Sequence, residues 1–193
     1  MFRLYFREFS RGKNNISLEK PDLLLVNRTK CDFMTKLSSQ QVAEYFNRNY
    51  KAVDGLWFMK VEEKYQFDTA LELDNEVWKV MPKIQARMVK SFLGLGNGLS
   101  ALFESIITKL ELEGFKFKAE KKENAFTITI TDCPWHNLML KSGRENLAKL
   151  VGKKICTTEY AVWSSEFGKT IKFNLKSQKC DKSEHCILAF VDQ

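Results

Sequence analysis

Four of the chain's five cysteines fall within the last third of the sequence, at Cys133, Cys156, Cys180 and Cys186. We predict that each lies where a helix or strand begins or ends. A fold that joins thiols so far apart must close this part of the chain on itself. Because thiolates are preferred ligands of zinc and other soft metals, the sequence predicts one metal site that uses all four.

The apolar runs of the chain indicate the compartment. None reaches the roughly 18 to 20 residues that cross a bilayer, and charges interrupt the first residues in a way that is not typical of a secretory signal. We therefore expect a cytoplasmic protein that does not enter the membrane. Thiols stay reduced there, which favours metal ligands or reactive groups over disulfides.

The net charge of +7 raises the question of a nucleic-acid partner. Residues 1–36 hold eight Lys and Arg against four Asp and Glu, and the charges after them are mixed. No zinc-finger spacing, RNA-binding aromatic motif or basic-region heptad is present, so we interpret the charge as a solvated surface. We predict a partly ordered basic extension over 1–36, with a short strand at Leu23–Val26, and a single domain over 37–193.

The first part of that domain, residues 37–113, predicts helices. Ser38 and Gln41 form a capping box at the first helix. Asp54 is expected to cap the second, and Asp68 a longer third helix that runs to about residue 93 and is kinked or broken near Met81 by the following proline. An apolar stripe at three- and four-residue steps is its expected core face; it consists of Leu73, Val77, Val80, Ile84 and Met88. A fourth helix runs from about 99 to 113.

Residues 114–193 change to a period of two, which predicts strands. Phe126, Ile128 and Ile130 alternate with threonines in the second strand of a first hairpin. Two helical segments follow, the first capped by Cys133 and the second beginning at Cys156. A second hairpin completes the order strand, strand, helix, helix, strand, strand. We therefore expect an α+β fold in which helices pack on a four-stranded antiparallel sheet.

The thiols leave more than one chemistry open. Helix N-termini would lower the pKa of Cys133 and Cys156, and a polar turn would present Cys180 and Cys186 to one point. His185 could replace one thiol. We expect zinc, because a metal would stabilise a small hairpin, and an iron–sulfur cluster remains the alternative.

A catalytic interpretation of the same stretch uses a thiolate and a base. Cys133 and His136 lie within one helical turn, where the two side chains can approach, although this spacing does not ensure contact and no third orienting residue is evident. Glu159 and Glu166 lie seven residues apart on a helix, where one could bind metal or act as a base. Solvated carboxylates are the simpler interpretation of these two residues.

The run DCPWHNLMLKSGRENLAKLVGKKICTTEYAVWSSEFG and the terminal hairpin CILAFV resemble vinyl-4-reductase-type domains. The resemblance is greater to proteins related to L-2-amino-thiazoline-4-carboxylic acid hydrolase, and covers roughly residues 40–191. It implies an α+β domain that binds small molecules, with zinc near the pocket held by Cys156, Cys180 and Cys186. The fourth ligand of such domains is a glutamate where this chain has Ser177, so Cys133 is its expected replacement.

These observations predict a metal-binding protein with an apolar pocket for a small cyclic ligand. The expected pocket residues are aromatic, namely Trp57, Trp78, Trp135, Trp163 and Phe167. The alternatives are a hydrolase of a small cyclic substrate of the 2-amino-thiazoline-4-carboxylate type and a ligand-responsive regulator. Both a monomer and a homodimer are compatible with the sequence.

Overall fold

The computed structural model describes residues 36–193, and the strand predicted at Leu23–Val26 lies outside them. The chain divides into two units, Met1–Ser38 and Ser39–Gln193. All helices and strands that the structure describes belong to the second unit.

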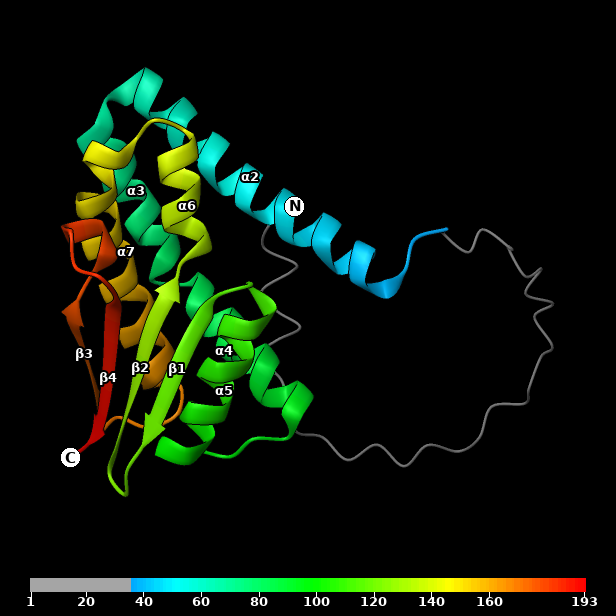
Figure 1. Ribbon diagram of the computed structural model, residues 1–193, viewed down its shortest axis with the longest axis vertical. Coiled ribbons are helices and arrows are strands. Elements are labelled where there is room, and N and C mark those ends of the chain that lie inside the picture. Colours follow the sequence, from blue (N-terminus) through cyan, green and yellow to red (C-terminus); the bar gives the residue numbers. More distant parts are fainter. Residues whose placement is uncertain (1–35) are drawn as a thin grey trace, which may run out of the picture. The chain divides into compact units, whose positions relative to one another are not determined.

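The predicted α+β class and strand arrangement are confirmed (Figure 1). The helices are α2 (Ser39–Tyr65), α3 (Phe67–Trp78), α4 (Met81–Leu93), α5 (Leu99–Leu112), α6 (Pro134–Lys141) and α7 (Glu145–Ser165), with a short 3-10 turn η2 (Lys179–Asp181). The strands are β1 (Lys116–Lys121), β2 (Ala125–Asp132), β3 (Ile171–Ser177) and β4 (Cys186–Asp192).

The four strands form one antiparallel sheet in the order β1-β2-β4-β3. Ile130, near the end of β2, pairs with Cys186, which begins β4. The end of β3 meets the same region, because Ser177 pairs with Ile187. The end of β2, the end of β3 and the start of β4 therefore lie together at one end of the sheet.

A closed apolar core lies between the sheet and helices α5 and α7. The alternation predicted for β2 is confirmed, since Phe126, Ile128 and Ile130 are all buried. Phe126 stacks on Phe190 of β4 with ring centroids 4.4 Å apart. From α7, Trp163 enters this core and its indole N–H donates to Ser105 Oγ at 3.0 Å.

The helical part differs from the prediction in where its helices begin. Asp54 is not a cap, because α2 continues through it to Tyr65. The chain then turns at Gln66, whose φ of 75° is in the left-handed region, and Asp68 lies in the first turn of α3 rather than capping it. The predicted interruption near Met81 is confirmed, since α3 ends at Trp78 and α4 begins two residues after Lys79.

The prediction that the apolar stripe of α3 and α4 faces the core is wrong. Its five residues are exposed, from 39% at Ile84 to 49% at Val77. The buried face of these helices instead carries Ala70 and Ala86, at 1% and 0% exposure. These helices also bury Trp78 and Val89, at 4% and 6% exposure, so packing against neighbouring elements, rather than the apolar period alone, decides which face is inside.

The second helical segment also differs from the prediction. Cys156 does not begin a helix, because α7 runs unbroken from Glu145 through Gly152 to Ser165. Glycine inside a helix usually weakens it. At Gly152 a Cβ would lie 3.1 Å from Cys180 Sγ, so the glycine permits the cysteine-bearing turn to approach the helix.

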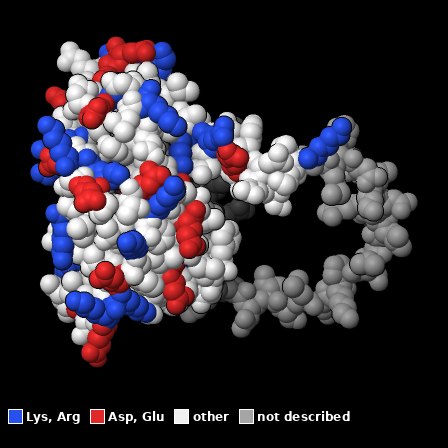
Figure 2. Space-filling model, in the orientation of Figure 1, with Lys and Arg blue, Asp and Glu red and all other residues white. Residues whose placement is uncertain are grey.

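Charged side chains of both signs are interspersed over the face seen in Figure 2. Among residues 36–193, no helix combines the length and apolar character needed to span a membrane.

Candidate functional site

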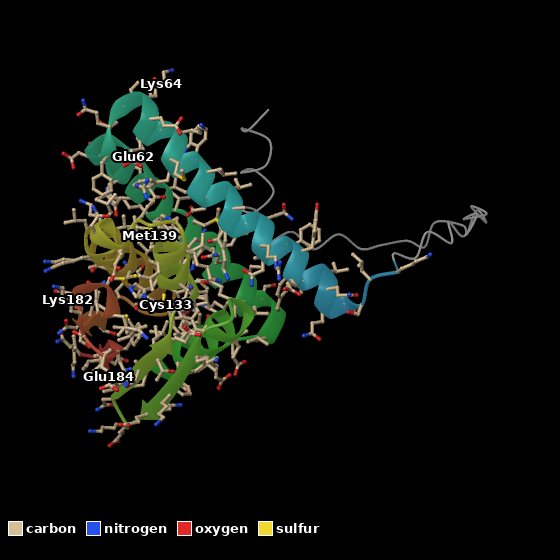
Figure 3. The ribbon with its side chains drawn as sticks, turned by 45° about the horizontal axis from the view of Figure 1, so that its top comes forward. Glu62, Lys64, Cys133, Met139, Lys182 and Glu184 are labelled. Carbon is tan, nitrogen blue, oxygen red and sulfur yellow. The ribbon has the colours of Figure 1, made fainter. Side chains whose placement is uncertain are left out.

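A cavity of about 320 Å³ lies at the end of the sheet where β2 and β3 terminate. Its walls come from α2, α3, α6, α7, η2 and the adjoining strand residues. Figure 3 shows Cys133 at the junction of β2 and α6, and Met139 further along α6. Both line the cavity, so α6 forms one of its walls. The volume is in the range of pockets that bind small organic molecules.

All four predicted metal ligands line this one cavity. The antiparallel sheet explains three of them: Cys133 follows β2, Cys186 begins β4, and Cys180 lies in the turn between β3 and β4. Cys156 comes from the middle of α7. The predicted convergence on one region of the molecule therefore results from strand register and from the packing of α7 beside η2.

Two of the sulfurs accept backbone hydrogen bonds. Cys133 is the N-cap of α6, as predicted, and its Sγ accepts from the N–H of His136 at 3.4 Å. The Sγ of Cys186 accepts from the N–H of Lys179 at 3.2 Å. Such bonds favour the thiolate over the thiol, so these two positions suit metal ligands or other anionic sulfur.

Burial nevertheless outweighs these bonds and raises the pKa of every cysteine at the site. Burial raises the pKa of Cys133 to about 12 and that of Cys180 to about 11. The pKa of Cys156 is raised by burial, by Glu159 and by the other three cysteines, which shows that the four sulfurs are electrostatically coupled. The expected lowering by a helix N-terminus is therefore present at Cys133 but outweighed by burial, and Cys156 lies in the middle of α7, away from a helix N-terminus.

The donors fit zinc in kind but are not arranged as a coordination site. Four thiols face one cavity, which is the donor set of a structural zinc site. Within residues 36–193, however, no three side chains of His, Cys, Asp or Glu are grouped as metal ligands. His185 does not line the cavity and lies beside Glu184, with Nε2 3.4 Å from Oε1.

The two residues of the predicted catalytic pair, Cys133 and His136, both line the cavity. The bond between Cys133 and His136 involves the backbone N–H of the histidine. A thiol with a pKa near 12 is a weak nucleophile at neutral pH. Glu166 lies elsewhere, where it accepts from Arg87 Nε at 2.7 Å.

Glu159 lines the cavity as part of a buried charge group with Lys109 and Glu113. The Lys109 Nζ lies 2.8 Å from Glu159 Oε1 and 3.0 Å from Glu113 Oε2. Burial raises the pKa of Glu159, while the nearby ammonium opposes this shift. Two carboxylates share one ammonium, so the group carries one negative charge when all three residues are ionised.

The aromatic predictions divide into two groups. Trp78 and Trp135 line the cavity, with their rings edge to face at 6.0 Å. Trp163 and Phe167 belong to the closed core, where each is 1% exposed, and they do not line the cavity. Trp57 is 64% exposed and faces away from the cavity.

Two cavity carboxylates were missed as site residues, namely Asp54 of α2 and Asp74 of α3. Burial raises the pKa of Asp54 to about 6. The pKa of Asp74 is raised to about 7 by burial and by Asp54, and a hydrogen bond from Trp78 opposes the shift. The available signal was spacing, because Asp54 precedes Phe58, and Asp74 precedes Trp78, by one helical turn on an inward face.

The fold and cavity define this protein as an α+β domain with a pocket whose lining includes four thiols. A family model described as "Family of unknown function (DUF6125)" matches residues 34–190, and the chain belongs to this family. Comparisons with curated proteins and with solved structures gave no match.

Proposed function

We propose that this protein binds a small cyclic molecule in the cavity. This cavity lies between the helices α2, α3, α6 and α7 and the end of the sheet where β2 and β3 terminate. The observation that carries the proposal is the cavity itself, which has a volume of about 320 Å³. Much of its lining is apolar, including Phe58, Met139 and Leu188, and a few polar groups adjoin it. A mainly apolar wall with a small number of placed polar groups is typical of small-molecule sites.

The aromatic side chains support a flat, cyclic ligand. Trp78 and Trp135 meet edge to face, and Tyr50 continues the contact to Trp135 at a centroid distance of 5.7 Å. Rings in such arrangements present faces and edges on which another ring packs favourably. The resemblance to vinyl-4-reductase-type domains points to the same class of ligand.

We further propose that the thiol end of the cavity binds zinc in a reducing, cytoplasmic environment. The shared cavity and the hydrogen bonds to Cys133 and Cys186 support this. Metal binding must draw the sulfurs together and displace their protons, since thiolates are the ligating form. Bound zinc would join α6, α7 and the terminal hairpin. Hydrolysis remains an expectation from the resemblance alone.

Ligand binding is tested with neutral probes of two sizes, benzyl alcohol and 1-naphthylmethanol. We expect saturable calorimetric binding and shifts of the indole N–H signals of Trp78 and Trp135. Val151→Phe should fill the cavity, because Val151 lines it, and weaken binding at least about tenfold. Leu150→Phe is the matched control, since Leu150 is the adjacent residue of α7, is 52% exposed and lies outside the lining. Absence of saturable binding, or equal loss in both variants, contradicts the proposed function.

Metal binding is tested separately by elemental analysis after anaerobic purification. We expect about one zinc per chain, as for a single four-thiolate site, and loss of most of it in Cys180→Ser. Cys31→Ser is the control, because Cys31 lies outside the cysteine stretch of residues 133–186. Less than about half an equivalent of zinc in the unsubstituted protein would contradict the metal proposal while leaving ligand binding to be judged by the titrations.

A further inference from the structure

The carboxylates of the cavity are not balanced by cations. Asp54 and Asp74 both line it, and the charge of Asp54 contributes to the raised pKa of Asp74. Within residues 36–193, neither has a Lys, Arg or His nitrogen within 4.0 Å. The hydrogen bond from Trp78 to Asp74 is a neutral contact and leaves the charge uncompensated.

The cations at the cavity wall have partners elsewhere. Arg144 Nη2 lies 2.6 Å from Glu62 Oε2. Lys51 Nζ donates to the backbone carbonyl of Glu113 at 3.0 Å. The buried Lys109 is shared between Glu113 and Glu159. In the described part of the chain, Arg144 and Lys109 are therefore paired with other carboxylates, and the ammonium of Lys51, although it lines the cavity, forms no ion pair with Asp54 or Asp74.

A third, more deeply buried carboxylate reinforces the negative character of the site. Glu159 is 7% exposed and lines the same cavity, and its charge group is net negative when ionised. The pKa of Tyr50 is raised by burial and then by Glu113, Glu159 and Asp54, although Lys109 opposes this shift. The negative potential therefore extends from α2 across to α7.

Aromatic rings accompany the carboxylates. Phe58 and Trp78 each lie one helical turn after a cavity aspartate, and both line the cavity together with Trp135. Ring faces attract organic cations, and the attraction grows where water is excluded. An uncompensated carboxylate in such a place lowers the stability of the ligand-free fold, and a cationic ligand would remove that penalty.

We propose that the cavity binds an organic cation, an amine on a compact cyclic body, with its nitrogen between Asp54 and Asp74. This inference rests on the proposed function and adds the charge of the ligand to it. The apolar body lies against the rings of Phe58, Trp78 and Trp135.

Two matched series of probes test this inference at pH 8. One series is benzylammonium, benzyl alcohol and benzoate; the other is 1-naphthylmethylammonium, 1-naphthylmethanol and 1-naphthoate. The members of a series share a ring and differ in the charge of one substituent. Calorimetry should show the ammonium binding at least about tenfold more tightly than the alcohol, and the carboxylate binding most weakly.

The double variant Asp54→Asn/Asp74→Asn should lose the preference for the ammonium and keep its affinity for the alcohol. Asp68→Asn is the matched control, since Asp68 is an exposed carboxylate of α3 outside the cavity lining. It should retain the full preference. Circular dichroism verifies that each variant is folded, which we expect because asparagine has nearly the same shape as aspartate.

The outcomes separate the two proposals. Equal or tighter binding of the alcohol or carboxylate in the unsubstituted protein overturns the cation inference and leaves the cavity function intact. An ammonium preference that survives in the double variant also overturns it, because the charge then acts elsewhere. If no member of either series binds, both the cavity function and the cation inference are refuted.

Discussion

The closed core and the cavity are two regions of one domain, and they differ in how completely their side chains are packed and paired. Phe126, Trp163 and Phe190 fill the core with 0% to 1% exposure, and the indole of Trp163 has its hydrogen-bond partner. The cavity is lined by four thiols and by two carboxylates with no ion-pair partner in residues 36–193. The core therefore supplies the stability on which a less stable, functional region depends.

The largest expected effect is on the free energy of unfolding, when the loss of a core ring is compared with the loss of a cavity side chain. Phe126→Ala removes a stacked ring that is 1% exposed and should lower the free energy of unfolding by about 3 to 5 kcal/mol. Met139→Ala enlarges an existing cavity and should lower it by only about 1 kcal/mol. Urea denaturation measures both changes. Equal losses would show that the cavity wall is packed as tightly as the core.

The next effect concerns the pH dependence of stability. The folded-state pKa values of Asp54 and Asp74, about 6 and about 7, lie above those of the unfolded chain, so folding favours their protonated forms. Their stabilising contribution is present at low pH and is lost as pH rises from about 4 to about 7. Asp54→Asn should therefore stabilise the ligand-free protein at pH 8 by about 1 to 3 kcal/mol.

Thermal denaturation between pH 5 and pH 8 measures this effect. The advantage of Asp54→Asn over the unsubstituted protein should shrink toward pH 5, and Asp74→Asn should behave in the same way. Asp68→Asn serves again as the exposed control and should show no comparable gain. A variant of either cavity aspartate that is less stable at pH 8 would mean that its carboxylate has a stabilising partner.

The smallest expected effect tests the outward apolar stripe. Leu73 is 47% exposed, so Leu73→Gln should change the free energy of unfolding by less than about 0.5 kcal/mol. Ala70→Leu, on the buried face of the same helix, should lower it by about 1 to 3 kcal/mol through overpacking. A large loss in Leu73→Gln that grows with protein concentration would reveal a second copy covering this face.

Local patterns account for much of what was correctly predicted. The alternation of Phe126, Ile128 and Ile130 identified a strand with one buried face because side chains on a strand alternate between faces. Pro82 marked the helix interruption because proline lacks the amide hydrogen that a helix interior requires. Cys133 was placed at the start of α6 because the following proline suits a first helical turn.

Predictions that required knowledge of neighbours were less successful. The stripe that includes Leu73 has a good helical period, yet α3 presents Ala70 to the interior. Cys156 was predicted to begin a helix, yet it lies in the middle of α7, which continues through Gly152 where Cys180 approaches. Trp57 and Trp163 were both predicted to line the pocket, but Trp57 is exposed and Trp163 belongs to the core.

The sequence by itself determined the order of the elements and the antiparallel hairpins, because these depend on contacts between residues that are near neighbours in the chain. The cysteine-rich character of the last third of the chain is a matter of composition and is visible in the sequence directly. Only the tertiary structure decided that four distant thiols and two aspartates line one cavity. That outcome depends on strand register and on which helix faces approach most closely. Both are set by packing between segments far apart in the chain, which a local pattern does not encode.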